Sequence, residues 1–235
     1  MNTWKAWATL ALTLAFAVSP LVSDPFTGFT ADQFPIPQVD PPAQPAGWAF
    51  SIWGVIYAWL VVSAAFGALR RPDATDWDAA RAPLMISLAA GVPWLAIATR
   101  SSEAASALIW VMLGGAVFAL VRAPQRDRWL LAAPVGLYAG WLTAASFVSL
   151  ASIGAGYGIL TDQVGWAYIA VIGALAIALP VQLRRPGVPT YAIAIGWALI
   201  GIIAANGYAN VGISLAAAAA ILVLAALPLR QRVTA

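Results

Sequence analysis

Long apolar runs, each bounded by charged residues or by proline and glycine, constrain the fold of this chain most. Eight of these runs approach the ~20 residues that a helix needs to cross a bilayer. They cover approximately residues 5–23, 47–69, 82–99, 104–121, 129–150, 165–183, 189–206 and 210–228. Only 9% of the residues are charged, against about 25% in a typical soluble domain. We therefore predict an all-α polytopic membrane protein with about eight transmembrane helices.

The positions of the basic residues support this number of spans and predict one orientation. If the N-terminus is cytoplasmic, every second connection between spans is cytoplasmic as well. Of the 12 basic residues, only Arg100 then falls on the outer side. The others are Lys5, Arg70, Arg71, Arg81, Arg122, Arg126, Arg128, Arg184, Arg185, Arg230 and Arg232. Because basic residues concentrate on the cytoplasmic side of membrane proteins, we predict that both termini are cytoplasmic.

The first apolar run has a second interpretation. A charged start, an apolar stretch and Ala17-Val18-Ser19 are also typical of a cleavable signal peptide. Cleavage would leave seven spans and an external N-terminus. The nearly full span length and the position of Pro20 favour a retained helix.

The first external connection, residues 24–46, is the longest. It carries six of the 16 prolines and three aspartates, with no basic residue. Because proline fixes φ and lacks a backbone donor, we expect an extended, semi-rigid strap. This strap is either a plain linker or a lid over a cavity that opens to the outer face.

Several kinds of chemistry are excluded or disfavoured by residue types that are missing. The chain has no cysteine and no histidine, which removes thiol chemistry, His-based catalysis and the usual zinc, copper and haem-iron ligands. No Asp, Glu, Lys or Arg lies in the middle of a predicted span, which argues against ion-coupled transport and against hydrolysis by paired carboxylates. We expect no cofactor, no metal and, because the basic residues follow the predicted topology, no nucleic-acid partner.

Two of the apolar runs carry aromatic residues at helical spacing, which places them on one face of each helix. These stripes consist of Phe50, Trp53 and Tyr57 in the second run and of Tyr138, Trp141, Ala145 and Ser149 in the fifth. If the stripes face each other, they form a pocket with flat apolar walls and a few polar groups, suited to a large flat ligand. The alternative is that they only pack helix against helix. Gly136 and Gly140 form a GxxxG motif, which we expect to serve packing within the monomer, with a homodimer seam as the alternative.

The same residues carry a resemblance to a known family. Residues 41–57, from Pro41-Pro42 through Trp48, Trp53 and Tyr57, resemble the entry to the second helix of the TspO/MBR family, the tryptophan-rich sensory proteins related to the translocator protein. The fifth run is similar to the family's fifth helix at Tyr138, Trp141, Thr143, Ala145 and Ser149. Ser149 and Gly91 stand where the family has asparagines, and the spacing from Trp48 to Trp53 is one residue shorter than in its short members. The aromatic lining is thus similar to that of the family, whereas much of its amide hydrogen bonding is missing.

The resemblance covers residues 1–150 and implies a five-helix unit, followed at 151–235 by three further helices and a short tail. The run Gly196 to Ile202 resembles the extension of longer bacterial members, which implies a bacterial cytoplasmic membrane. The family binds porphyrins, haem precursors, sterols and synthetic aromatic compounds. The resemblance thus implies a receptor or transport-like protein with a ligand site at Trp48, Phe50, Trp53, Tyr57, Trp94, Tyr138, Trp141, Thr143, Ala145 and Ser149. The expected partners are a porphyrin-like or sterol-like molecule and the lipid bilayer. The alternatives are a small-molecule permease or flippase, a porphyrin-degrading enzyme that uses Trp or Tyr radicals, and a regulatory protein without a ligand.

Overall fold

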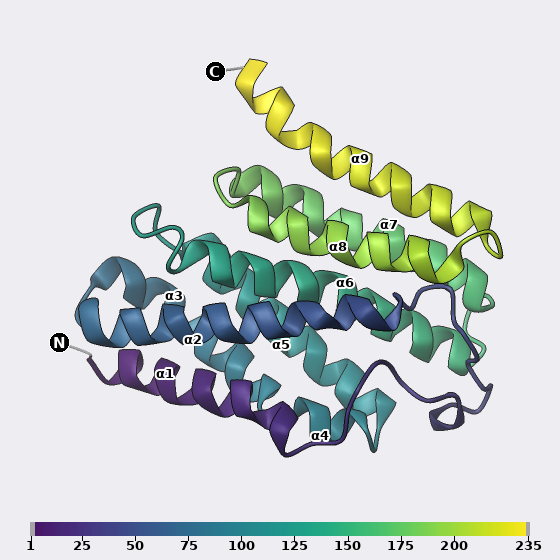
Figure 1. Ribbon diagram of the computed structural model, residues 1–235, viewed down its shortest axis with the longest axis horizontal. Coiled ribbons are helices and arrows are strands. Elements are labelled where there is room, and N and C mark those ends of the chain that lie inside the picture. Colours follow the sequence, from purple (N-terminus) through teal and green to yellow (C-terminus); the bar gives the residue numbers. More distant parts are fainter. Residues whose placement is uncertain (1–2, 234–235) are drawn as a thin grey trace.

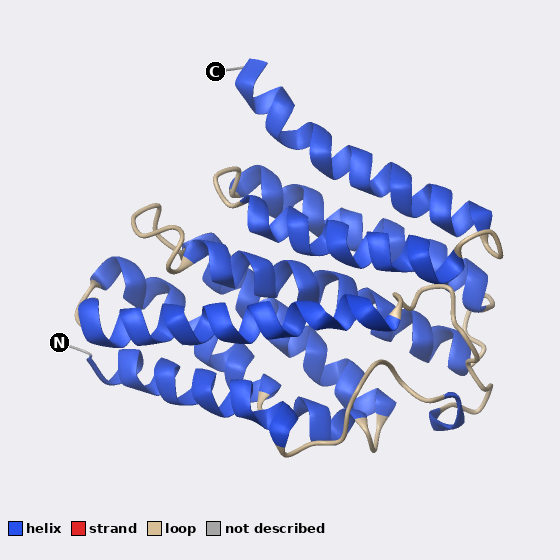
Figure 2. Ribbon diagram, viewed as in Figure 1, coloured by secondary structure: helices blue, strands red, loops and turns tan. Residues whose placement is uncertain are grey.

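The computed structural model describes residues 3–233, which form an all-α bundle without a strand in that range (Figures 1 and 2). The helices are α1 (Thr3–Val18), α2 (Ile52–Arg70), α3 (Thr75–Gly91), α4 (Trp94–Ala98), α5 (Ser102–Arg122), α6 (Ala132–Gly156), α7 (Gln163–Arg184), α8 (Pro189–Asn206) and α9 (Val211–Val233). Short 3-10 turns cover Ser19–Leu21, Ala31–Gln33 and Gly47–Ser51.

Six of these segments are long and apolar enough to cross a membrane. They are Thr3–Leu21, Gly47–Arg70, Ser102–Arg122, Ala132–Gly156, Gln163–Arg184 and Pro189–Asn206. The eighth predicted span corresponds to the shorter apolar stretch Val211–Leu227 of α9. The prediction of a polytopic all-α membrane protein is therefore confirmed.

The third predicted span is a broken helix. The helix α3 ends at Gly91 and α4 begins at Trp94, with Pro93 between them. Proline has no backbone N–H to continue the ladder, so an uninterrupted apolar run still folds as two pieces. The helix α3 also begins before the predicted run, which starts at residue 82. Its first turn carries Asp76 and Asp78, so the apolar pattern does not indicate this part of the helix.

The helix α6 is the centre of the bundle. Of its most apolar window, 72% is buried, compared with 50% or less in the other five candidate spans. It packs against α2, α5, α7 and α8. The glycines of the GxxxG motif face α8, where a Cβ atom on Gly140 would collide with the carbonyl oxygen of Tyr191 and one on Gly136 would lie 2.7 Å from Thr190 Oγ1. The motif thus serves packing within the monomer.

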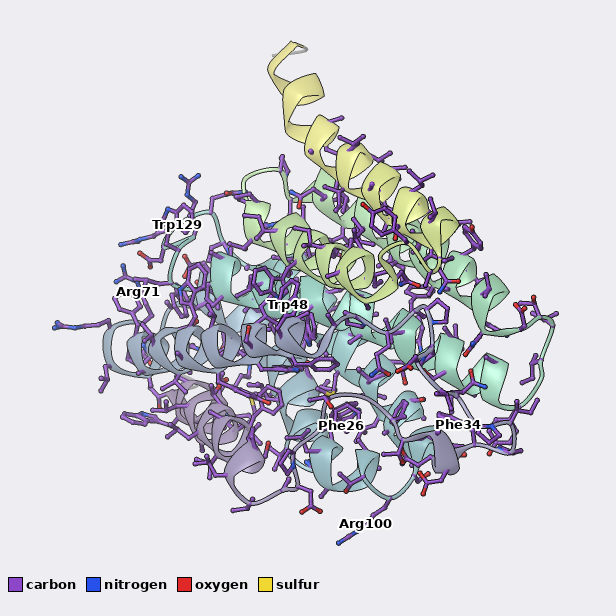
Figure 3. All side chains as sticks on the ribbon, turned by 45° about the vertical axis from the view of Figure 1, so that its right-hand side comes forward. Phe26, Phe34, Trp48, Arg71, Arg100 and Trp129 are labelled. Atoms are coloured by element: carbon purple, nitrogen blue, oxygen red, sulfur yellow. The ribbon has the colours of Figure 1, made fainter. Side chains whose placement is uncertain are left out.

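The basic connections gather at one end of the bundle. The α2–α3, α5–α6 and α7–α8 connections lie at the end where α1 begins and α9 ends, and Figure 3 shows Arg71 and Trp129 together there, away from Arg100. Two ion pairs link different segments at this end of the bundle. They run from Lys5 to Asp78 at 2.6 Å and from Arg71 to Asp127 at 2.7 Å. One end of the bundle is thus basic, as the sequence predicts. That this end faces the cytoplasm stays a prediction.

Candidate ligand-binding site

A small cavity lies toward the opposite end of the bundle, under the strap. Its volume is about 60 Å³. The strap, the 3-10 turn Gly47–Ser51, the helices α2, α4, α5 and α6, and one residue of α8 form its walls. The lining residues are Phe26, Gly28, Phe29, Gln44, Pro45, Phe50, Trp53, Trp94, Ile109, Met112, Trp141, Leu142, Ala144, Ala145, Val148, Ser149, Ser152 and Ala198.

Six of the 18 lining residues are aromatic, and neighbouring rings among them meet edge to face. The ring of Trp141 lies 5.7 Å from Phe50 and 6.2 Å from Trp53, with interplanar angles of 79° in both pairs. On the strap side, Phe26 meets Trp94 at 5.1 Å and 86°. The Trp94 indole is fixed by a 2.9 Å hydrogen bond from Nε1 to the carbonyl oxygen of Ala105. Edge-to-face pairs stabilise a ring arrangement beyond the burial of area, so these walls are ordered.

The polar groups of the cavity are few and uncharged. Ser149 and Ser152 lie on successive turns of α6, and Ser149 Oγ is hydrogen-bonded to Ser106 Oγ on α5 at 2.5 Å. Gln44 of the strap adds an amide, which donates to the carbonyl oxygen of Thr27 at 3.1 Å. Within the described range, no three Asp, Glu, His or Cys side chains come together in a way that would hold a metal ion. The lining therefore suits a largely apolar ligand with one or two hydrogen-bonding groups.

The strap is hydrogen-bonded to three helices. Ile36 N–H donates to Gly156 at the end of α6 (2.9 Å), and Gln33 Nε2 donates to Ala98 at the end of α4 (2.9 Å). At its second half the strap is held by α8. Ala46 N–H donates to the carbonyl of Gly201 at 3.0 Å, and Asn206 Nδ2 donates to the carbonyl of Pro42 at 2.9 Å. The strap is thus a cover held to the helices at its middle and through its second half, which agrees with a lid better than with a plain linker.

Six of the ten predicted site residues line the cavity. They are Phe50, Trp53, Trp94, Trp141, Ala145 and Ser149. The two predicted stripes do face each other, because Trp141 of α6 packs on Trp53 of α2.

The other four predicted residues lie outside the lining. Trp48 is half exposed and packs edge-on against Trp197 of α8 at 5.0 Å. Tyr57 stacks on the far side of Trp53 at 5.2 Å. The last two are buried in helix interfaces: Tyr138 OH is hydrogen-bonded to Ser87 Oγ at 3.0 Å, and Thr143 Oγ1 to Tyr191 OH at 3.0 Å.

Several lining residues were not predicted. Phe26 and Phe29 lie in the irregular strap, where no periodicity indicates which way a side chain points. Ala198 comes from α8, which the sequence places with the additional helices. The only signal for the strap phenylalanines was their position beside an expected lid.

Comparison with known proteins gives one match. The family model described as TSPO-like protein matches residues 5–229, from α1 into α9. No curated protein and no solved structure matches the chain. The match includes the helices that follow residue 150 as well as the predicted five-helix unit before it. The chain therefore belongs to the family of TSPO-like proteins.

Proposed function

We propose that this protein is a membrane receptor or transport protein that binds a flat hydrophobic ligand, of the tetrapyrrole or sterol class, in the aromatic cavity. One observation carries the proposal: rings from α2, α4, α6 and the strap converge on one uncharged space with two serines at its edge. Flat apolar walls with a few polar groups favour a ligand that is itself flat and apolar.

Ligand entry requires the strap to move. The cavity of about 60 Å³ is much smaller than the roughly 300–1,000 Å³ of typical small-molecule sites. The strap supplies five of the lining residues, and they are Phe26, Gly28, Phe29, Gln44 and Pro45. Displacing them opens the space without unfolding a helix. The structure is thus the closed form in this proposal.

Ligand binding is favourable when burial of the ligand's apolar surface outweighs the free energy needed to open the strap. A ligand that removes about 300 Å² of apolar surface from water gains about 7 kcal/mol before ordering costs. Breaking the strap hydrogen bonds costs about 1 kcal/mol each. With the four strap hydrogen bonds described above broken, about 3 kcal/mol remains, which corresponds to binding in the millimolar range.

Titration with protoporphyrin IX in the dark tests the proposal, with quenching of tryptophan fluorescence as the readout. Ala145→Leu places a larger side chain in the cavity and removes no tryptophan, so we expect affinity to fall at least tenfold. Ala107→Leu is the matched control, because Ala107 is exposed on the outer face of α5. Absence of saturable quenching in the wild type, or equal affinity in both variants, would contradict the proposal.

Transport of the ligand is a second candidate, favoured by the break between α3 and α4. Irregular backbone within a membrane occurs where it is buried in protein or lines a cavity, and Trp94, the first residue after the break, lines this one. Uptake of protoporphyrin IX into proteoliposomes separates transport from binding alone. Loss of porphyrin absorbance under light or oxygen would instead support the enzymatic alternative.

A further inference from the structure

A second hollow lies at the basic end of the bundle, separate from the aromatic cavity. It is an open groove of about 640 Å³ between α8, α9 and the α5–α6 connection. Its lining residues are Arg128, Trp129, Gln182, Pro186, Gly187, Pro189, Ala192, Ile193, Gly196, Trp197, Ile200, Ile221, Leu224 and Ala225. Figure 1 shows α9 diverging from α8 toward its C-terminal end, and the lining residues of α8 and α9 lie in this wedge.

The groove is apolar along its length and basic at its mouth. Its inner part is lined by aliphatic side chains and Trp197, whereas Arg128 lies exposed at the connection, 5.4 Å over the ring of Trp129. An exposed tryptophan beside an arginine is typical of the level of lipid headgroups.

The charge around the mouth is not balanced by acidic residues. The α5–α6 connection contains one acid, Asp127, and its carboxylate is paired with Arg71 at 2.7 Å. From residue 163 to residue 227 the sequence has two arginines, Arg184 and Arg185, and no aspartate or glutamate. The groove therefore opens at a surface of net positive charge.

One polar side chain of the groove, that of Gln182, has a hydrogen-bond acceptor without a partner among the described residues. Gln182 is 4% exposed, and its Nε2 donates to the carbonyl oxygens of Arg185 and Val188 at 3.0 and 3.4 Å. Its Oε1 accepts no hydrogen bond from any residue that the structure describes. Unpartnered buried polar atoms are costly, so this end of the groove fits a ligand with polar atoms of its own.

We propose that the groove binds an anionic phospholipid. One acyl chain lies along α8 and α9, and the phosphate lies at Arg128. A headgroup hydroxyl, such as the glycerol of phosphatidylglycerol, donates to Gln182 Oε1. An acyl chain matches the apolar lining, and a negative headgroup matches the basic mouth of the groove. This site does not depend on the ligand proposed for the aromatic cavity.

Native mass spectrometry of the purified protein tests the site. Phosphatidylglycerol and phosphatidylcholine with identical acyl chains are compared as probes. We expect phosphatidylglycerol to bind more tightly, and Arg128→Gln to reduce that preference about fivefold. Gln182→Leu removes the unpartnered acceptor, and we expect it to weaken phosphatidylglycerol while leaving phosphatidylcholine unchanged.

A steric block distinguishes the groove from the general lipid surface. A Cβ atom at Gly196 would meet no atom within 4 Å, so the side chain of Gly196→Leu starts in open space and extends into the groove. Gly114 of α5 is equally open, and Gly114→Leu is the matched control. We expect loss of tightly bound phosphatidylglycerol only in the Gly196 variant.

Three results would overturn the inference. They are equal binding of the two lipids, equal loss in the two leucine variants, and competition by inorganic phosphate as strong as that by the lipid. Porphyrin titration of the Gly196 variant keeps the two sites apart, because a failed lipid site leaves that titration unaffected.

Discussion

Asn206 is the residue through which α8 holds the strap closed, and its replacement gives the sharpest test of the lid. The side chain is 5% exposed and donates from Nδ2 to the carbonyl oxygens of Pro42 and Ile202, each at 2.9 Å. In Asn206→Ala, the carbonyl of Pro42 loses this donor. Leaving such a group unpaired costs about 1–3 kcal/mol. The opening equilibrium of the strap should therefore rise at least about fivefold.

Hydrogen–deuterium exchange of the strap measures this opening directly and needs no ligand. The amides of Ile36 and Ala46 are suitable reporters, because both donate across to other helices. We expect Ala46 to exchange at least about fivefold faster in Asn206→Ala, since it lies nearest the lost bond. Ile36, bonded to Gly156, should change less.

The matched control is Asn210→Ala, in the connection between α8 and α9. The side chain of Asn210 has no hydrogen bond to the described residues, so the same substitution there should leave the strap unchanged. Unchanged exchange at Ala46 in Asn206→Ala would refute the reasoning. Faster exchange throughout α6 would do so as well, because it would indicate loss of global stability.

Two further substitutions test the packing and the basic end. Gly140→Leu should lower the thermal midpoint strongly, because overpacking the contact with Tyr191 costs about 1–3 kcal/mol or more; a midpoint equal to that of Gly114→Leu would contradict the close contact of α6 and α8. At the basic end, the hydrogen bond from Arg71 holds the pKa of Asp127 below its usual range. The pair therefore stabilises the fold above the ordinary carboxyl pKa, and this contribution disappears as the pH falls through the lowered value. The difference in thermal midpoint between wild type and Asp127→Asn should be largest near neutral pH and shrink on acidification, whereas a difference independent of pH would exclude this role.

Helical periodicity was sufficient to predict much of the fold and five of the 18 residues that line the cavity. Because side chains three and four positions apart share a helix face, Phe50 and Trp53 could be matched with Trp141 and Ser149 before any contact was known. The spacing predicts the face of each helix, but it does not predict how far along that face a cavity extends. Tyr57 and Tyr138 therefore lie on the predicted stripes yet outside the lining.

The contributions of the strap and of α8 to the cavity could not be predicted in this way. The direction of Phe26 depends on an irregular backbone whose course is set by distant hydrogen bonds, such as that between Gln33 and Ala98. The contribution of Ala198 depends on how closely α8 approaches α6. That distance is set by Gly136 and Gly140, which indicate a close approach but not the partner helix.

The attachment of the strap to α8 limits how the chain can be shortened. Two of the four strap hydrogen bonds to helices described above, at Gly201 and Asn206, come from α8. A protein ending near residue 150 would lose both and would also leave the glycine face of α6 open to lipid. Here the cavity lining ends at Ala198 and the last of these hydrogen bonds at Asn206, so a chain shortened to the end of α8 would still keep both the cavity and the contacts that close it.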